Sequence, residues 1–129
     1  MLKFDYTPTS MDENDAGHVD NVLIYGWFDA RRQDLFRSLR MLPVTQGFFS
    51  IVQATINYQA EVFAGAGISI ETGVKKIGGS SFVIWQTLCQ KGVVCATLES
   101  VAVNMSAETR KSEALDDPVR NKLTDLQVA

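Results

Sequence analysis

The chain has 129 residues, 46% of them hydrophobic and 21% charged, with a net charge of −3 from 12 Lys and Arg against 15 Asp and Glu. This length predicts a single domain over residues 1–129, and the composition excludes a disordered chain. The negative charge argues against nucleic acid as a partner, since phosphate binding needs excess Lys and Arg. No apolar run is long enough for a membrane span, and no apolar N-terminal segment indicates export. We therefore expect a cytoplasmic protein that binds neither membranes nor nucleic acid.

Cysteine and histidine are scarce. Cys89 and Cys95 are the two cysteines, and His18 is the single histidine. Their spacing could bring the two cysteines close together across a hairpin. Because the sequence shows no sign of export, we expect two reduced thiols. One histidine and no Cys-x-x-Cys pair argue against a metal site, and the lack of Gly-x-Ser-x-Gly leaves a Ser-His-Asp triad without support. We expect no metal and no cofactor.

The first half of the chain predicts a strand and one long helix. Residues 2–6 alternate weakly and stop before Pro8, and the polar residues 10–20 predict a loop. Apolar residues then recur at helical spacing over 22–42, with Asp20 as the N-cap and Pro43 as the stop signal. The predicted core stripe is Ile24, Trp27, Phe28, Leu35, Leu39 and Leu42, interrupted by Arg31, while Arg32, Gln33, Arg37 and Arg40 lie largely on other faces.

After Gly47 the period of the pattern changes to two residues, which predicts strands over 52–58, 68–75, 81–89 and 93–105. Lys91-Gly92 is the predicted tight turn between the last two. Both of these strands carry apolar residues on both faces, and one helix covers only one face of a sheet, so the other face indicates a second subunit. For 81–89 the two faces are Phe82, Ile84 and Leu88 against Val83, Trp85 and Cys89.

The charged tail over 106–129 predicts a short terminal helix that begins at Asp117-Pro118. Val119, Leu123 and Leu126 form its thin apolar stripe. The complete order is one strand, one long helix and four strands. This order predicts the α+β class, with a helix packed on an antiparallel sheet.

The segment Asp12–Asn21, D-E-N-D-A-G-H-V-D-N, resembles the acidic-loop motif of hotdog-fold acyl-CoA thioesterases of the 4-hydroxybenzoyl-CoA thioesterase-like family, roughly D-x-D-x-x-G-H-V-N-N. Further segments follow in the family's order over residues 2–105. They are Trp27-Phe28-Asp29 with Arg32, Ile56-Asn57-Tyr58 with Glu61 and Gly65, and I-G-G-S-S-F over 77–82. The resemblance implies the hotdog fold, an antiparallel sheet wrapped around one long central helix. It also implies a homodimer or homotetramer with its site at the subunit boundary.

The sequence departs from the family pattern at three positions, Asn14, Asp20 and Ile24. Asn14 falls where the family has its catalytic carboxylate, and Asp15 follows one residue later, as if the loop were one residue shorter. Asp20 replaces the first Asn of the family's pair. Ile24 stands where Tyr is usual, with Tyr25 displaced by one. These departures concern the chemistry rather than the fold.

Thioester hydrolysis needs donors for the developing oxyanion and a group that activates water. The start of the helix, at Asn21 and Val22, would supply free N–H groups and a partial positive charge. Asp15 is the first choice for the carboxylate and Asp12 the second, although both could equally be loop and cap acids. The resemblance thus implies Asp15, Asn14 and His18 as catalytic, with Asn14 orienting water or forming a turn, and His18 bracing the loop or moving protons. The implied substrate-binding residues are Asp12, Asn21, Val22, Tyr25, Tyr58, Gly79, Ser80 and Ser81. Three lysines, Lys75, Lys76 and Lys91, could bind coenzyme A phosphates or simply be solvated.

The leading hypothesis is therefore an acyl-CoA thioesterase, with coenzyme A as part of the substrate. Asn14 at the carboxylate position keeps a second hypothesis open, a hotdog protein that binds acyl thioesters without chemistry. A third is a hotdog enoyl-CoA hydratase, since Asp12-Glu13-Asn14 followed by His18 comes within one residue of the Asp-x-Asn-x-x-His motif.

Overall fold

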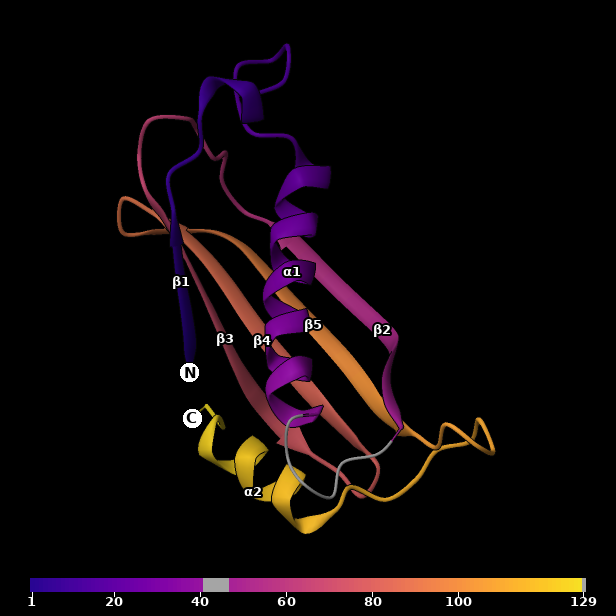
Figure 1. The fold of residues 1–129 in the computed structure, drawn as a ribbon. Coiled ribbons are helices and arrows are strands. Elements are labelled where there is room, and N and C mark those ends of the chain that lie inside the picture. The colour runs from indigo at the N-terminus through magenta and orange to yellow at the C-terminus, as the bar shows by residue number, and fades with distance from the viewer. Residues whose placement is uncertain (41–46, 129) are drawn as a thin grey trace.

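The computed structural model describes residues 1–40 and 47–128. A five-stranded antiparallel sheet in the order β1-β3-β4-β5-β2 is crossed on one face by the long helix α1 (Figure 1). The predicted α+β order of elements is confirmed, with one 3-10 turn added in the loop after β1. The elements are β1 (Leu2–Tyr6), η1 (Ser10–Asp12), α1 (Asn21–Arg40), β2 (Phe48–Tyr58), β3 (Ile68–Ile77), β4 (Ser81–Gln90), β5 (Val93–Met105) and α2 (Asp117–Asp125). Neither helix in the described part of the chain is long and apolar enough to cross a membrane.

Helix α1 begins where the sequence predicts because Asp20 caps it. The Asp20 carboxylate accepts a hydrogen bond from the Val22 N–H at 3.0 Å, and the Asp20 carbonyl accepts one from the Ile24 N–H at 3.2 Å. Leu42 and Pro43, the predicted end of the helix, lie outside the described residues. The residues that the helix buries are Ile24, Phe28, Arg32, Leu35, Phe36 and Leu39.

The buried face of α1 corrects the sequence prediction at three positions. Arg32 was predicted on a polar face and is only 4% exposed. Phe36 is buried although the predicted stripe omitted it, and Trp27 is only half-buried, with its ring edge-on to Tyr6 at 5.4 Å between centroids. The helical period alone predicts that Trp27 is buried. Its packing partner Tyr6 lies in the edge strand β1, so the Trp27 ring stays partly exposed to solvent.

A polar layer divides the core beneath the middle of α1. The Arg32 guanidinium donates to the Ser100 hydroxyl and the Asp29 carboxylate, both at 2.9 Å. On the neighbouring strands, the Gln86 amide donates to the Phe28 carbonyl at 2.9 Å and to the Thr72 hydroxyl at 3.2 Å. One apolar cluster lies on either side of this layer, so the helix is fixed to the sheet by hydrogen bonds as well as by packing.

Strand β2 forms an edge of the sheet and starts four residues earlier than predicted. Its pairing with β5 is interrupted between Ile51 and Gln53, which is a β-bulge at Val52. The bulge leaves Val52 61% exposed, although simple alternation had placed it on the same face as Ile56. Most residues from Val52 to Tyr58 are exposed, so the free edge of β2 has no cover in a single chain.

The predicted turn and the two-faced strands are confirmed. Lys91 and Gly92 both have positive φ angles, 53° and 75°, as a type I′ hairpin turn requires. Strand β4 alternates strictly between buried and half-exposed residues. Val83 and Trp85 therefore lie half-exposed on the face of the sheet that α1 does not cover.

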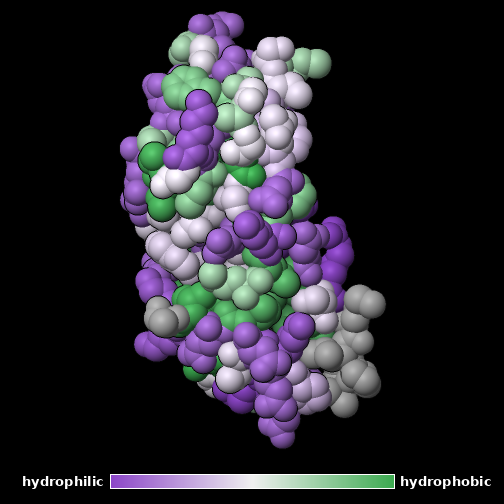
Figure 2. Space-filling view, turned by 90° about the vertical axis from the view of Figure 1, so that its left-hand side faces the viewer, coloured by the Kyte–Doolittle hydropathy of each residue, from purple (hydrophilic) through white to green (hydrophobic). Residues whose placement is uncertain are grey.

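The C-terminal tail closes one end of the core. Helix α2 starts at Asp117 as predicted, because the Asp116 carboxylate accepts a hydrogen bond from the Val119 N–H at 3.1 Å. Val119, Leu123 and Leu126 are buried in the same cluster as the C-terminal half of α1. On the β1 side, hydrophobic side chains gather just below the middle of the molecule (Figure 2). The tail is thus part of the core, which its thin apolar stripe only partly indicated.

Candidate functional site

A pocket of about 280 Å³ lies at the N-terminal end of α1. Its walls come from the end of the acidic loop, the first turn of α1, and the segment that follows β2. The lining residues are His18, Val19, Asn21, Ile24, Tyr58, Gln59, Ala60, Glu61 and Val62. Three of the residues predicted for the site, His18, Asn21 and Tyr58, thus meet at this pocket.

The acidic loop is held in place by its own backbone. Asn14 donates its N–H to the His18 carbonyl at 2.9 Å and accepts the Gly17 N–H at 3.0 Å, which closes a tight turn. The Asn14 side-chain oxygen accepts the Ala16 N–H at 3.0 Å, so it is engaged within the turn. Asp15 lies exposed at the tip of this turn and is not among the residues that line the pocket.

Asp12 anchors the start of the loop. Its carboxylate accepts hydrogen bonds from the Tyr6 hydroxyl at 2.9 Å and from the Thr9 N–H at 2.8 Å. The hydrogen bond to Asp12 raises the pKa of Tyr6, with smaller contributions from burial and from the charge of the carboxylate. Asp12 therefore fastens η1 to β1 and lies outside the pocket wall.

His18 and Glu61 face each other at the pocket. The His18 Nδ1 lies 3.1 Å from the Val19 carbonyl, so this nitrogen carries the proton and donates. The His18 Nε2 is left toward the Glu61 carboxylate, 3.9 Å away. The His18 side chain is 24% exposed and that of Glu61 is 62% exposed. The ring is thus oriented by the backbone and reaches solvent through its second nitrogen.

The first turn of α1 presents backbone donors beside this pair. The Val22 N–H is taken by the Asp20 cap, which corrects the expectation that it is free. Among the described residues, the N–H groups of Asn21 and Leu23 have no hydrogen-bond partner. The Asn21 carbonyl accepts the Tyr58 hydroxyl at 2.9 Å. Burial, followed by the nearby charge of Asp20, raises the pKa of Tyr58, so its hydroxyl remains a donor.

A family model described as the thioesterase-like superfamily matches residues 7–123. The chain belongs to this superfamily. No curated protein matches this chain, but many solved structures are similar to it. A predicted thioesterase from Bacillus stearothermophilus is 28% identical, with a TM-score of 0.87 and coverage of 98% of this chain and 96% of that one.

Two further neighbours of this thioesterase-like chain share its fold. A 1,4-dihydroxy-2-naphthoyl-CoA thioesterase from Synechocystis is 16% identical with a TM-score of 0.79, and 96% of each chain is covered. A thioesterase from Thermus thermophilus, solved with coenzyme A and zinc, is 19% identical with a TM-score of 0.79, covering 97% of this chain and 92% of that one. The hotdog fold and the thioesterase family predicted from the sequence are therefore confirmed.

Three other predicted site residues of this superfamily member, Gly79, Ser80 and Ser81, lie far from the pocket, and Tyr25 does not line it. Gly79 and Ser80 occupy the β3–β4 turn at the opposite end of the sheet, where the Gly79 carbonyl accepts the Leu115 N–H at 2.9 Å. Ser81 begins β4 there. Tyr25 packs against the core, with the Arg32 guanidinium 5.6 Å from its ring. A single chain thus divides the predicted set between two ends of the molecule.

The pocket contains one acidic side chain that the sequence prediction did not assign to the site. Glu61 follows β2 by three residues, and the sequence indicates it only as part of the family pattern. Its distance to His18 depends on how the acidic loop packs against the segment after β2. The Val19 N–H donates to the Val62 carbonyl at 2.7 Å, and the Ala64 N–H donates to the Glu13 carboxylate at 3.0 Å. The one sequence signal for the role of Glu61 is that it is a polar residue shortly after Tyr58.

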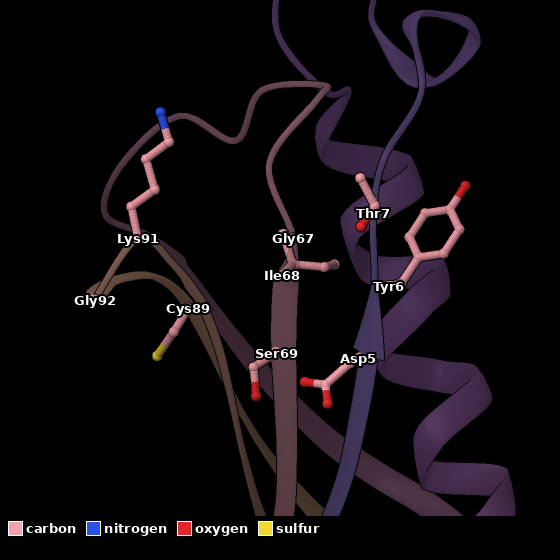
Figure 3. A pocket seen from close by; sticks show the side chains of 9 residues that line it. All are labelled: Asp5, Tyr6, Thr7, Gly67, Ile68, Ser69, Cys89, Lys91 and Gly92. Carbon is pink, nitrogen blue, oxygen red and sulfur yellow. The ribbon is translucent and has the colours of Figure 1, made fainter.

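A larger and shallower pocket, about 600 Å³, lies on the face of the sheet that α1 does not cover (Figure 3). Asp5, Ser69 and Cys89 stand in one row across β1, β3 and β4, since Asp5 pairs with Ser69 and Ser69 with Cys89. Lys91 points away from this row (Figure 3). Among the described residues no hydrogen bond joins these three side chains.

Proposed function

We propose that this protein hydrolyses acyl-CoA thioesters in the pocket at the start of α1. The observation that supports this proposal is the convergence of three kinds of group. Asn21, whose N–H has no hydrogen-bond partner among the described residues, lines the same pocket as His18, and the Glu61 carboxylate lies 3.9 Å from the His18 Nε2. The names of the neighbours with coenzyme A and acyl-CoA substrates favour the same substrate class.

In the proposed mechanism, the thioester carbonyl oxygen lies at the N-terminus of α1. The His18 Nε2 takes a proton from water, whose oxygen attacks the carbonyl carbon, and Glu61 stabilises the imidazolium that forms. The N–H groups of Asn21 and Leu23 hold the tetrahedral oxyanion, a contribution worth about 10²–10³ in rate. The C–S bond then breaks, and the thiolate of coenzyme A takes the proton from His18. Products are the free acid and coenzyme A.

Asp15 is the competing base and comes from the sequence motif. It is exposed at the tip of the acidic loop and does not line the pocket at the start of α1. A role for Asp15 would require a second subunit to enclose the tip. The His18–Glu61 pair needs no such step, and we therefore prefer it.

We further propose that the protein is a homodimer formed through the free edge of β2. This edge strand is eleven residues long, and the exposed apolar residues Val22, Leu23, Val52 and Tyr58 lie on it or beside it. Antiparallel pairing of two β2 edges would satisfy the unpaired backbone groups and cover these side chains. The half-exposed face with Trp85 would be the contact of a homotetramer, and sedimentation at micromolar concentration distinguishes the two assemblies. We place the protein in the cytoplasm, since Cys89 and Cys95 lie on opposite faces of the sheet as free thiols.

Thiol release from short, long and aryl acyl-CoAs tests the proposal, after subtraction of the protein's own thiols. We expect His18→Ala to lower kcat at least about 100-fold and Glu61→Gln about tenfold. Asp15→Asn should change kcat less than about twofold, the size of change expected of a surface substitution. Loss of turnover in Asp15→Asn alone would make Asp15 the base. Binding of acyl-CoA without turnover in the wild type would make the protein an acyl-thioester-binding hotdog, which the engaged Asn14 side chain favours as the second candidate.

A further inference from the structure

A separate pocket of about 270 Å³ lies between β1 and α1. Strands β1 and β2 form the opposite edges of the sheet, so this pocket is on the side of α1 away from β2 (Figure 1). It shares no lining residue with the pocket at the start of α1. The residues that line it are Phe4, Tyr6, Trp27, Ala30 and Arg31. The proposed thioester chemistry uses none of them.

Three of the five lining side chains are aromatic. The rings of Tyr6 and Trp27 meet edge-on, with 5.4 Å between their centroids. Phe4, Tyr6 and Trp27 pack against one of the two apolar clusters, yet each stays partly exposed. Such rings present faces and edges against which a planar ring can stack. The volume is just below the roughly 300–1,000 Å³ of pockets for drug-sized ligands, so it suits a ligand with a single ring.

Arg31 supplies the charge of this pocket. Its guanidinium lies 3.7 Å from the centroid of the Phe4 ring, which holds it in a cation–π contact. The Arg31 side chain is 23% exposed. Within the described part of the chain, its buried Nε has no hydrogen-bond partner and neither Nη donates a hydrogen bond. The pocket wall therefore contains a fixed cation with unused donors.

Asp34 does not neutralise this cation on the side of the pocket. Its carboxylate lies 3.3 Å from the Arg31 Nε and 3.0 Å from the Arg37 Nη1, so one acid is shared by two arginines. Asp34 lines a separate cavity of about 70 Å³ and not the pocket. Asp12 does not line the pocket either, although it accepts the Tyr6 hydroxyl at 2.9 Å. Among the described residues, the pocket thus has a cation in its wall and no acid.

This charge selects between the ligands that an aromatic pocket can hold. Aromatic rings alone attract an ammonium group, but a guanidinium in the same wall repels it. A carboxylate instead accepts two parallel hydrogen bonds from the edge of a guanidinium. The Tyr6 hydroxyl is already engaged with Asp12, which leaves Arg31 as the group that would hold the carboxylate.

We propose that the pocket between β1 and α1 binds a small aromatic carboxylate. The carboxylate lies on the Nη groups of Arg31, and the ring packs against Trp27 and Tyr6. This inference does not depend on the proposed thioesterase function, because it concerns a different pocket and is tested by binding alone.

Benzoate is the probe, and the two tryptophans of the chain report where it binds. Trp27 lines the pocket, whereas Trp85 lies on the face of the sheet that α1 does not cover. In NMR spectra of isotope-labelled protein at constant ionic strength, benzoate should shift the Trp27 indole N–H resonance with a Kd of about 1 mM or lower. The Trp85 resonance should stay in place, and Trp27→Phe assigns the two signals. No saturable shift of the Trp27 resonance, or equal shifts of both, would overturn the inference.

Three analogues test the chemistry of the ligand on the wild-type protein. Benzamide, which has the ring without the charge, should bind at least about tenfold more weakly than benzoate. Cyclohexanecarboxylate, which has the charge without the aromatic ring, should bind about threefold or more weakly. Benzylammonium should not bind at the pocket. A Kd for benzamide or cyclohexanecarboxylate equal to that of benzoate, or binding of benzylammonium in its place, would contradict an aromatic carboxylate as the ligand.

Arg31→Met and Arg37→Met form a matched pair of variants. Each removes one of the two arginines that share Asp34, but only Arg31 lines the pocket. Arg31→Met should weaken benzoate binding at least about tenfold and leave benzamide binding unchanged, whereas Arg37→Met should change neither Kd. Equal losses in both variants, or no loss in Arg31→Met, would refute the role of Arg31. If Arg31→Met does not fold, the comparison of benzoate with benzamide on the wild type still decides the inference.

Discussion

Replacing Asp29 with alanine should destabilise the protein by about 2 kcal/mol, because the buried Arg32 guanidinium would lose its charged partner. The Arg32 side chain is 5% exposed and its Nη2 lies 2.9 Å from the Asp29 carboxylate, which is itself 47% exposed. Breaking a fully buried ion pair costs about 3–5 kcal/mol, and an exposed pair contributes at most about 1 kcal/mol. In this pair the Arg32 guanidinium is buried and the Asp29 carboxylate is partly exposed. We therefore expect the cost of breaking it to lie between the values for buried and exposed pairs.

The matched variant Arg32→Met separates the charge from the packing. Methionine has a similar length and removes the buried charge, and the Ser100 hydroxyl loses one hydrogen-bond donor. The free energy of unfolding should therefore change by no more than about 1 kcal/mol. In the double variant, Asp29→Ala should then have almost no further effect.

The measurement is urea unfolding followed by tryptophan fluorescence, at one fixed protein concentration because the proposed dimer links stability to concentration. A loss of about 2 kcal/mol corresponds to a fall in Tm of roughly 6–10 °C. Wild-type stability in Asp29→Ala, or an equal loss in the Arg32→Met background, would show that the carboxylate does not compensate the guanidinium.

Three other substitutions and measurements test the backbone and the thiols. Lys91→Asn should stabilise the protein by about 0.5–1 kcal/mol, since asparagine suits the positive φ of the type I′ turn; a lower Tm would contradict the turn assignment. Gly73→Ala should cost about 1–3 kcal/mol in urea unfolding, because its Cβ would lie 2.6 Å from the Val128 Cγ1. Gly26→Ala is its control in α1, with nothing within 4 Å of the new Cβ, and should stabilise the helix by about 1 kcal/mol. Burial raises the pKa of Cys95 above its ordinary 9.0, so Ellman's reagent at pH 8 should label the other cysteine first, and equal rates would refute this.

Local patterns in the sequence were sufficient for most elements. The change of period near Gly47 separated the helix from the strands, and Asp20 and Asp117-Pro118 marked the helix starts within a residue. Lys91-Gly92 marked the tight turn. Each of these signals depends on residues within a few positions of one another, where backbone sterics and capping hydrogen bonds act directly.

The site was only partly predictable. The motif indicated His18 and Asn21, because loop and helix start adjoin in the sequence. The engagement of the Val22 N–H follows from the Asp20 cap, which the sequence predicts, but Glu61 could not be placed 3.9 Å from His18 until the segment after β2 was packed against the loop.

The tertiary structure alone decided the burial of Arg32 and the bulge at Val52. Arg32 is buried because Ser100, on a strand beneath the helix, accepts its hydrogen bond. Ser100 lies 68 residues further along the chain, where local sequence patterns do not reach. The bulge depends on how β2 pairs with β5, and it turns Val52 outward against its own alternation. Helical and strand periodicities report which face of an element is apolar, but a polar side chain is buried only where distant elements supply its hydrogen bonds.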